Sequence, residues 1–170
     1  MKQAPSPSRG AARIIVTGGT FDKHYDAIKG ELTFKNSHLA AILEQARVTV
    51  PIALEINQLI DSLEMRDEHR RSVLAACQSA PESSIVVIHG TDTMAQTATV
   101  VGAAGLNKTI VFTGAMIPYS VQGSDALFNL GFALAAAQTL AANTYVAMNG
   151  RVFDWQEAKK NKLAGIFEAR

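Results

Sequence analysis

The stretch "IIVTGGTF", residues 14–21, decides the fold class of this chain. The uninterrupted β-branched run Ile14-Ile15-Val16 is typical of a strand that is buried on both faces of a parallel sheet. Two glycines follow at once between Thr17 and Thr20, so the strand ends in a tight turn. Such a turn fits a plain strand end, a phosphate cradle or the mouth of an active site, and the stretch alone does not choose among the three.

The same pattern of a strand followed by a turn recurs along the chain, with helices between the strands. Strands are predicted at residues 14–16, 48–54, 85–88, 109–113 and 145–148. Helices are predicted at residues 39–46, from 67 to Pro81, over 94–102, and onward from Ser124 or Asp125. This alternation predicts an α/β fold with a doubly wound, mostly parallel sheet and helices on both faces, in a Rossmann-like three-layer arrangement.

Size and composition point to a globular protein with a small partner. The 170 residues suit one domain, expected over residues 11–170 behind a flexible Pro- and Ser-containing lead at residues 1–10. Hydrophobic residues make up 48% and charged residues 18%, and the formal net charge is only +1 at pH 7. A charge so close to zero gives no electrostatic attraction for nucleic acid or for an anionic membrane surface, so neither partner is expected.

The chain is expected to be cytoplasmic and free of metals. Its single cysteine, Cys77, excludes an intrachain disulfide and a CxxC metal site. Residues 1–10 lack the apolar segment of a secretory signal, and the most apolar later stretch, residues 133–142, is shorter than the ~20 residues of a membrane-spanning helix. The four histidines lack metal-binding spacing, and His89 is expected to be a buried structural residue.

Polar residues gather directly after the predicted strands. In open parallel sheets, ligands bind in the crevice beyond the carboxyl ends of the strands. At those positions the chain carries TGGT (17–20), Asp61-Ser62, HGTDT (89–93) and TGAM (113–116). Hydroxyl groups, carboxylates and glycines are therefore predicted to converge on one edge of the sheet.

The TGGT stretch lacks the pattern of either common phosphate-binding loop. It matches neither the GxGxxG of dinucleotide sites nor the GxxxxGK[ST] of P-loops. Its glycines instead allow close backbone approach and leave amide groups free to bind an oxyanion, while Thr20 projects a hydroxyl into the crevice. Thr20 is thus a candidate nucleophile, although a threonine here often only closes a turn with local hydrogen bonds.

The HGTDT stretch supplies a second reactive group. Asp92 places a carboxylate beside the hydroxyl of Thr91, and the helix that follows offers spare backbone amides for a negatively charged substrate group. Asp92 would fit a simple helix cap equally well on local sequence. Two Gly-Thr elements on neighbouring strand ends favour a site over two unrelated turns.

Four motifs in order resemble a known family. TGGTF, HGTDTM, TGAMIP and the FNL of residues 128–130 look like the N-terminal domain of the bacterial-type L-asparaginase and glutaminase-asparaginase family, over about residues 14–160. The resemblance implies hydrolysis of L-asparagine, in some members also of L-glutamine, to the acid and ammonia without a metal or cofactor.

The resemblance also implies residue roles. Thr20 would be the nucleophile that accepts the acyl group, Tyr25 its activating partner, Thr91 the second threonine and Asp92 the group that binds the substrate α-ammonium. Ser62 would hold the α-carboxylate, and the backbone carbonyl of Ala115 would face the side-chain amide. Contacts to L-asparagine are therefore expected from Gly19, Ser62, Gly90, Thr91, Asp92 and Ala115.

The sequence departs from the family pattern in three places. A catalytic lysine is expected on the helix after residues 128–130, yet residues 125–142 contain none, which leaves Lys160 as a candidate against a plain solvated basic run. Leu63 replaces a glutamine that commonly follows the family's serine. The family's C-terminal domain, which helps to close a neighbouring subunit's site, has no counterpart here, so a homodimer or higher homo-oligomer is expected.

Two hypotheses follow. The first is an L-asparaginase that acts through a threonine acyl-enzyme. The second is an amino-acid-binding or regulatory module of the same fold with little or no turnover, suggested by the three departures. A nucleotide-binding α/β domain has the fold in its favour but lacks the loop chemistry.

Overall fold

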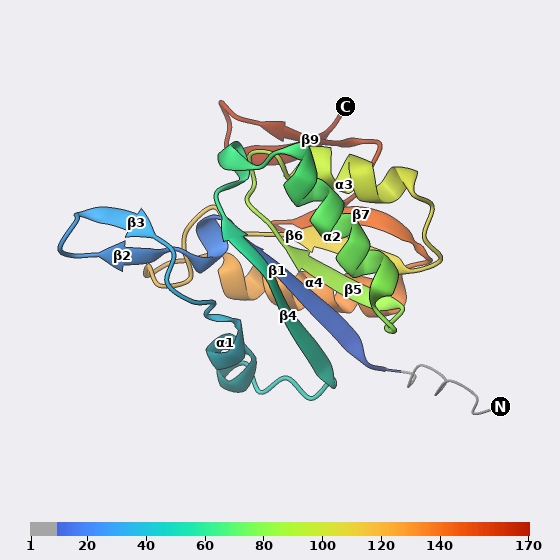
Figure 1. Cartoon of the computed structure of the whole chain (residues 1–170), viewed down its shortest axis with the longest axis horizontal. Helices are drawn as coiled ribbons and strands as arrows, with labels where there is room; N and C mark the ends of the chain where they lie inside the picture. Colours follow the sequence, from blue (N-terminus) through green and yellow to red (C-terminus); the bar gives the residue numbers. More distant parts are fainter. Residues whose placement is uncertain (1–9) are drawn as a thin grey trace.

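A six-stranded sheet organises residues 10–170, the part of the chain that the computed structural model describes (Figure 1). Residues 1–9, nearly all of the expected lead, lie outside it. The sheet has the order β4-β1-β5-β6-β7-β8. Its strands are β1 (Ala12–Gly18), β4 (Ile52–Ile60), β5 (Ser84–Ile88), β6 (Thr109–Thr113), β7 (Asn143–Met148) and β8 (Arg151–Asp154). The first five run parallel, and β8 pairs antiparallel with β7.

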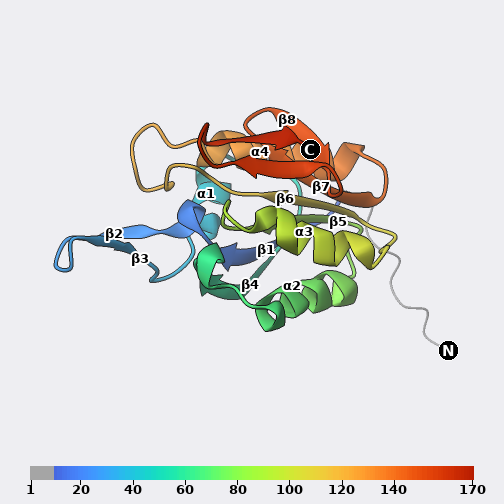
Figure 2. The ribbon, with the colours of Figure 1, turned by 90° about the horizontal axis from the view of Figure 1, so that it is seen from above.

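Helices cover both faces of the sheet, and Figure 2 shows the three layers. The helices are α1 (Leu39–Gln45), α2 (Asp67–Ser79), α3 (Met94–Ala103) and α4 (Ala126–Thr139). Side chains alternate along each strand, so Ile14 and Val16 pack toward α1 and α4 while Ile15 packs toward α2 and α3. The predicted doubly wound, mostly parallel α/β fold is therefore confirmed. Within residues 10–170, no helix is long and apolar enough to cross a membrane.

The strand order contains one reversal, and it lies beside the motifs. From β1 the chain passes to β4 on one side and later returns to place β5 on the other side. Parallel α/β sheets bind ligands at such a switch point, beyond the carboxyl ends of the strands. In this molecule the TGGT turn follows β1 and the HGTDT turn follows β5, so the fold brings the two motifs side by side.

Two hairpins and one strand of the structure were not expected. Strands β2 (His24–Asp26) and β3 (Glu31–Thr33) form a hairpin that projects from the body (Figure 1), and β9 (Ala158–Asn161) pairs with β10 (Ile166–Ala169). Strand β8 follows β7 through Asn149-Gly150, both at positive φ. An Asn-Gly pair between apolar runs is a strong hairpin signal, so the hairpin of β7 and β8 could have been predicted from the sequence.

The expected strand at 48–54 is displaced in the structure. Strand β4 begins only after Pro51, which has no N–H for the ladder, and continues to Ile60. Its side chains are mostly half-buried because β4 is the edge of the sheet. The polar Asn57 and Gln58 are therefore compatible with this strand, which continues beyond its predicted end at residue 54.

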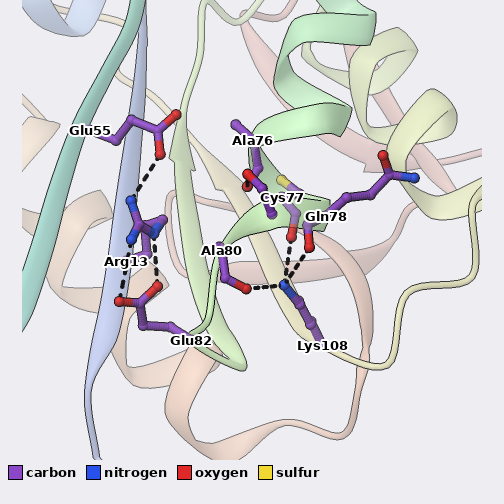
Figure 3. Close-up of polar contacts among 9 residues, drawn as sticks. Arg13, Glu55, Ala76, Cys77, Gln78, Ala80, Glu82 and Lys108 are labelled. Atoms are coloured by element: carbon purple, nitrogen blue, oxygen red, sulfur yellow. Dashed lines mark hydrogen bonds and ion pairs between the residues drawn. The ribbon is translucent and has the colours of Figure 1, made fainter. Parts of the chain in front are cut away.

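Charged side chains stabilise the end of the sheet that lies opposite the TGGT and HGTDT turns (Figure 3). Near the start of β1, Arg13 donates to Glu82 at 2.8 Å and to Glu55 at 2.9 Å. Lys108, just before β6, donates from Nζ to the carbonyl oxygens of Cys77 (2.7 Å) and Ala80. Carbonyls at the end of α2 thus gain a charged donor in place of the helical partners they lack.

Candidate active site

The loops after β1, β4 and β5 touch through glycines. Gly18 and Gly19 have φ of +99° and +74°, a region that favours glycine. A Cβ on Gly19 would lie 2.4 Å from Cα of Gly90, and a Cβ on Gly90 would lie 2.6 Å from Oγ of Ser62. Since Thr20 and Thr91 each directly follow one of the touching glycines, the backbone places both threonines and Ser62 around one point.

The two threonines of TGGT have different environments. The buried Thr17 donates its hydroxyl to the carbonyl of Ile88 at 2.9 Å, which ties β1 to β5. Thr20 is half-buried at the start of a short 3₁₀ turn (Thr20–Asp22), and among residues 10–170 its hydroxyl makes no hydrogen bond. Thr20 therefore keeps a free hydroxyl at the switch point, while Thr17 serves the fold.

Lys160 joins Thr91 and Asp92 in one hydrogen-bonded set. Its Nζ donates to Oγ1 of Thr91 at 2.7 Å and to Oδ1 of Asp92 at 2.8 Å. The side chain of Lys160 is only 14% exposed, whereas that of Lys159, the preceding residue, is 59% exposed. A lysine from β9, and none from α4, therefore contacts Thr91 and Asp92, and the alternative of a solvated basic run does not hold for Lys160.

The hairpin that carries Lys160 is fixed by apolar contacts. Ala158 on β9 and Phe167 on β10 are buried in the core that includes β5 and α3, and Lys160 pairs directly with Phe167. Successive residues of a strand point to opposite sides. Burial of Ala158 therefore sends Lys160 inward and Lys159 outward.

Ser62 occupies a rigid turn after β4. It is 2% exposed, and its carbonyl accepts a hydrogen bond from Thr93 Oγ1 at 2.8 Å, which links the turn to the HGTDT loop. The preceding Asp61 accepts from Lys23 Nζ at 2.5 Å and from the Leu63 amide at 3.0 Å. Burial raises the pKa of Asp61, but these two donors outweigh it and leave that pKa below its ordinary value.

Ala115 is fully buried in the loop after β6. The carbonyl of the preceding Gly114 accepts from Asn129 at 2.9 Å, and the amide of the following Met116 donates to Asp125 at 3.0 Å. Asp125 was expected only as a possible cap of α4, yet Ser124 makes that contact, accepting from the Ala126 amide at 3.0 Å. Asp125 is therefore free to hold the Ala115 loop, a role that sequence reasoning missed.

Tyr25 is the predicted site residue that the structure does not bring to the others. It lies on β2, pairs with Leu32 across the hairpin and is 63% exposed. Among residues 10–170 its hydroxyl contacts none of Thr20, Thr91 or Asp92. Its assigned role remains a prediction.

His89 is a satisfied core residue, as expected. Its Nδ1 lies 2.8 Å from the carbonyl oxygen of Gly90, and its Nε2 lies 2.8 Å from Oγ1 of Thr97. Burial lowers the pKa of His89 to about 4, so the ring is neutral near pH 7. Within the described part of the chain, no cluster of three or more His, Cys, Asp or Glu could hold a metal ion.

The arrangement has the parts that amide chemistry requires. A free hydroxyl can attack a carbonyl carbon, and a second hydroxyl held by a lysine can orient a water. A carboxylate such as that of Asp92 can bind an ammonium group, and a hydroxyl such as that of Ser62 can donate to a carboxylate, through charge-assisted hydrogen bonds. The switch point therefore brings together the kinds of group that a nucleophile and an anchor for a zwitterion would require.

Comparison with known proteins gives a consistent result. L-asparaginase 1 of Escherichia coli K12 is 30% identical over 165 residues, which cover 90% of this chain and 48% of that protein. A glutamyl-tRNA(Gln) amidotransferase subunit of Thermococcus kodakarensis is 29% identical over 153 residues, 83% of this chain and 34% of that protein. The chain thus spans half or less of the length of these relatives.

Solved structures share the fold. The thermostable L-asparaginase from Thermococcus kodakarensis superposes with a TM-score of 0.82 and 25% identity, over 94% of this chain and 51% of that one. The family model described as asparaginase, N-terminal, matches residues 12–166, a span that includes every predicted site residue. The chain therefore belongs to the asparaginase family, whose N-terminal domain it matches.

Proposed function

We propose that this chain is an amidohydrolase that converts L-asparagine to L-aspartate and ammonia through an acyl-enzyme on Thr20. The observation that carries the proposal is the contact of Lys160 with both Thr91 and Asp92, beside the free hydroxyl of Thr20. A turn that served only the fold would not need a nearly buried lysine between a hydroxyl and a carboxylate. The 30% identity to an L-asparaginase over nearly the whole chain supports the same reading.

The proposed reaction has two halves. Thr20 Oγ1 forms a bond to the side-chain amide carbon, the C–N bond breaks, and the hydroxyl proton ends on the departing ammonia. Water then adds to the resulting ester, the bond from that carbon to Thr20 Oγ1 breaks, and Thr20 recovers its proton as L-aspartate leaves. Together, these two easier steps replace the direct attack of water on an unreactive amide.

The surrounding side chains have distinct proposed roles. Lys160 donates to Thr91, so the Thr91 hydroxyl proton is directed elsewhere and can orient the attacking water. Asp92 binds the substrate ammonium, while Ser62 and the amides of the glycine turns bind the carboxylate. Tyr25 would activate Thr20 if its hairpin folds over the site. L-glutamine, longer by one methylene, is a second substrate to test, since one methylene changes discrimination by only about 1–3 kcal/mol.

The alternative is an amino-acid-binding or regulatory module with little turnover. It is favoured by relatives that are subunits of an amidotransferase, such as the one from Thermococcus kodakarensis at 29% identity. We also propose a cytoplasmic, homo-oligomeric protein; a structure with the same fold is named as a probable cytoplasmic L-asparaginase from Campylobacter jejuni. Size-exclusion chromatography with light scattering tests the oligomer directly.

Ammonia release separates the two functions. The wild type should release ammonia from L-asparagine, and Thr20→Ala should lower kcat by at least about a thousandfold because the nucleophile is lost. Thr139→Ala is the matched control, since this exposed threonine on α4 donates its hydroxyl to the Ala135 carbonyl, one turn back on the same helix. Folded wild type that releases no ammonia at millimolar L-asparagine, yet gains thermal stability from that ligand, would overturn the hydrolase and favour the binding module.

A further inference from the structure

We propose that Asp125, Asn129 and Asn149 form a positioning triad that sets the Ala115 loop, and with it the place of the substrate's side-chain amide. The inference rests on the proposed function and adds residues whose part in it was not expected. The three come from different segments: the start of α4, its next turn, and the turn between β7 and β8. All three lie near the loop of residues 114–117 after β6.

Asp125 holds the loop backbone directly. Its Oδ1 accepts from the amides of Met116 and Ile117, both at 3.0 Å, and Oδ2 lies 3.1 Å from the Met116 amide. Oδ2 also accepts from the side-chain amides of Asn129 and Asn149, each at 2.9 Å. Both carboxylate oxygens are thus occupied by the protein, so Asp125 acts on the loop and not on a substrate.

Asn129 holds the other side of Ala115. Its Nδ2 donates to the Gly114 carbonyl at 2.9 Å, and its Oδ1 accepts from the Asn149 backbone amide at 3.0 Å. The residue is completely buried, and each of its side-chain polar atoms has a partner. A buried amide with matched donors and acceptors on every side admits one orientation, because rotation would leave polar groups unpaired.

Asn149 ties this pair to the sheet. Its φ of +47° is the left-handed conformation of a two-residue hairpin turn, and Asn tolerates that conformation better than most residues. From there its backbone amide reaches Asn129 and its side chain reaches Asp125. The position of the loop therefore depends on the end of β7 as well as on α4.

The loop in turn touches the strand that carries the reactive groups. A Cβ on Gly114 would lie 2.3 Å from the carbonyl oxygen of His89, the residue before Gly90 and Thr91. A shift of the loop therefore changes the separation between Ala115 and the HGTDT segment. Among residues 10–170, the proposed anchors of the amino-acid end, Asp92 and Ser62, have no bond to the triad, so only the amide end of the substrate should respond.

Removal of the Asn149 side chain should change turnover more than binding. Asn149→Gly keeps the positive φ and the backbone donor to Asn129, but it deletes the side-chain donor to Asp125 and a longer contact, at 3.4 Å, to Oδ1 of Asn129. We expect kcat for L-asparagine to fall about three- to tenfold, the range set by the net contribution of a hydrogen bond, with KM changed by less than about twofold. The ratio of L-asparagine to L-glutamine turnover should change as well, since the two amides lie at different depths.

A matched control distinguishes positioning from stability. Asn143→Ala removes another Asn-to-Asp hydrogen bond, to Asp154 at 2.6 Å, at the opposite end of β7. It should lower the urea midpoint as much as Asn149→Gly or more, without changing kcat or the substrate ratio. Equal kinetic losses in both variants, or a raised KM with unchanged kcat in Asn149→Gly, would overturn the triad.

An added carboxylate tests the same contact. Asn149→Asp sets two carboxylates face to face and should lower kcat more than Asn149→Gly does. Equal kcat values for Asn149→Asp and Asn149→Gly, at equal thermal stability, would count against the contact.

Failure of the proposed function would be seen separately. If the wild type releases no ammonia, the hydrolase is rejected, and the triad is then tested through ligand-induced thermal shifts with L-asparagine and L-2-aminobutyrate, which lacks the amide. In a protein without turnover the triad can act only on binding, so Asn149→Gly should weaken the stabilisation by L-asparagine and leave that by L-2-aminobutyrate unchanged. Equal weakening of both ligands, or of neither, would overturn the triad.

Discussion

Lys160 and Lys159 are adjacent in sequence, but only Lys160 points into the candidate site. Substituting each in turn therefore tests whether the site needs the Lys160 side chain. Lys160→Met removes the donor to Thr91 and Asp92 and should lower kcat for L-asparagine by about 100- to 1000-fold, the usual effect of deleting one preorganised donor. Steady-state ammonia release measures the change.

Lys159→Met is the matched control. Lys159 is exposed and lies 3.7 Å from the Glu168 carboxylate, so its loss should change kcat by less than about twofold and stability by at most about 1 kcal/mol. Similar kinetics for the two variants would contradict a role for Lys160 in the site.

His89 should make stability depend on pH. Its pKa of about 4 in the folded protein lies below the ordinary value of 6.5, so the unfolded chain takes up the proton first as the pH falls. The full contribution is present above pH 6.5, and about 3 kcal/mol should be lost as the pH falls from 6.5 to 4. His89→Gln cannot titrate and should flatten this slope in urea unfolding experiments.

His38 should account for part of the slope that remains in His89→Gln. Its pKa is lowered by burial first and by the adjacent His24 second, and the nearby Asp22 opposes both effects. A His89→Gln protein with the full wild-type slope would show that the buried His89 ring is not the group that titrates.

The sequence predicted which residues gather at the edge of the sheet better than it predicted their contacts. Thr20, Ser62, Thr91 and Asp92 were expected there because each closely follows a strand, and parallel strands end at one edge of the sheet. The contact of Lys160 depends on the β9–β10 hairpin, which packs on the core through Ala158 and Phe167. This hairpin was not predicted because short polar strands lack a clear hydrophobic periodicity.

At the scale of elements, the contact between the glycine turns sets the spacing of the motifs. Gly19→Ala would force a Cβ to 2.4 Å from the Gly90 backbone at a φ of +74°. Overlap and strain together should lower the free energy of unfolding by about 2–4 kcal/mol and reduce activity at least as severely. Urea unfolding followed by circular dichroism measures the first effect.

Gly131→Ala is the matched control, and it is expected to raise the free energy of unfolding. Gly131 lies within α4 and its Cβ would meet nothing within 4 Å, so the variant should gain about 0.5–1 kcal/mol from helix propensity. If both glycine variants shifted the urea midpoint in the same direction, the close approach of Gly19 and Gly90 would not be the cause.

Element prediction succeeded where strands are buried and failed where they are exposed. The buried runs in β1, β5, β6 and β7 can be recognised from their β-branched composition. The edge strand β4 carries polar residues and was displaced, and the antiparallel β8 could have been found from its Asn-Gly turn.

At the scale of the whole molecule, the charged contacts of Arg13 and Lys108 lie at the end of the sheet opposite the candidate site. Lys108→Met leaves the carbonyls of Cys77 and Ala80 without their charged donor, far from Thr20. The expected result is a loss of about 1–3 kcal/mol in the free energy of unfolding, with kcat and KM unchanged. A change in kcat at a temperature where the variant is fully folded would contradict this separation of the two ends.

The late position of Lys160 in the chain sets when the contact with Asp92 can form during synthesis. Asp92 and Lys160 are 68 residues apart. At about 5–20 residues per second, a ribosome adds the lysine on the order of 3–14 seconds after the aspartate. A nascent chain can therefore form most of its parallel sheet before this contact exists, and under the proposed function a chain interrupted before β9 would be folded in part but inactive.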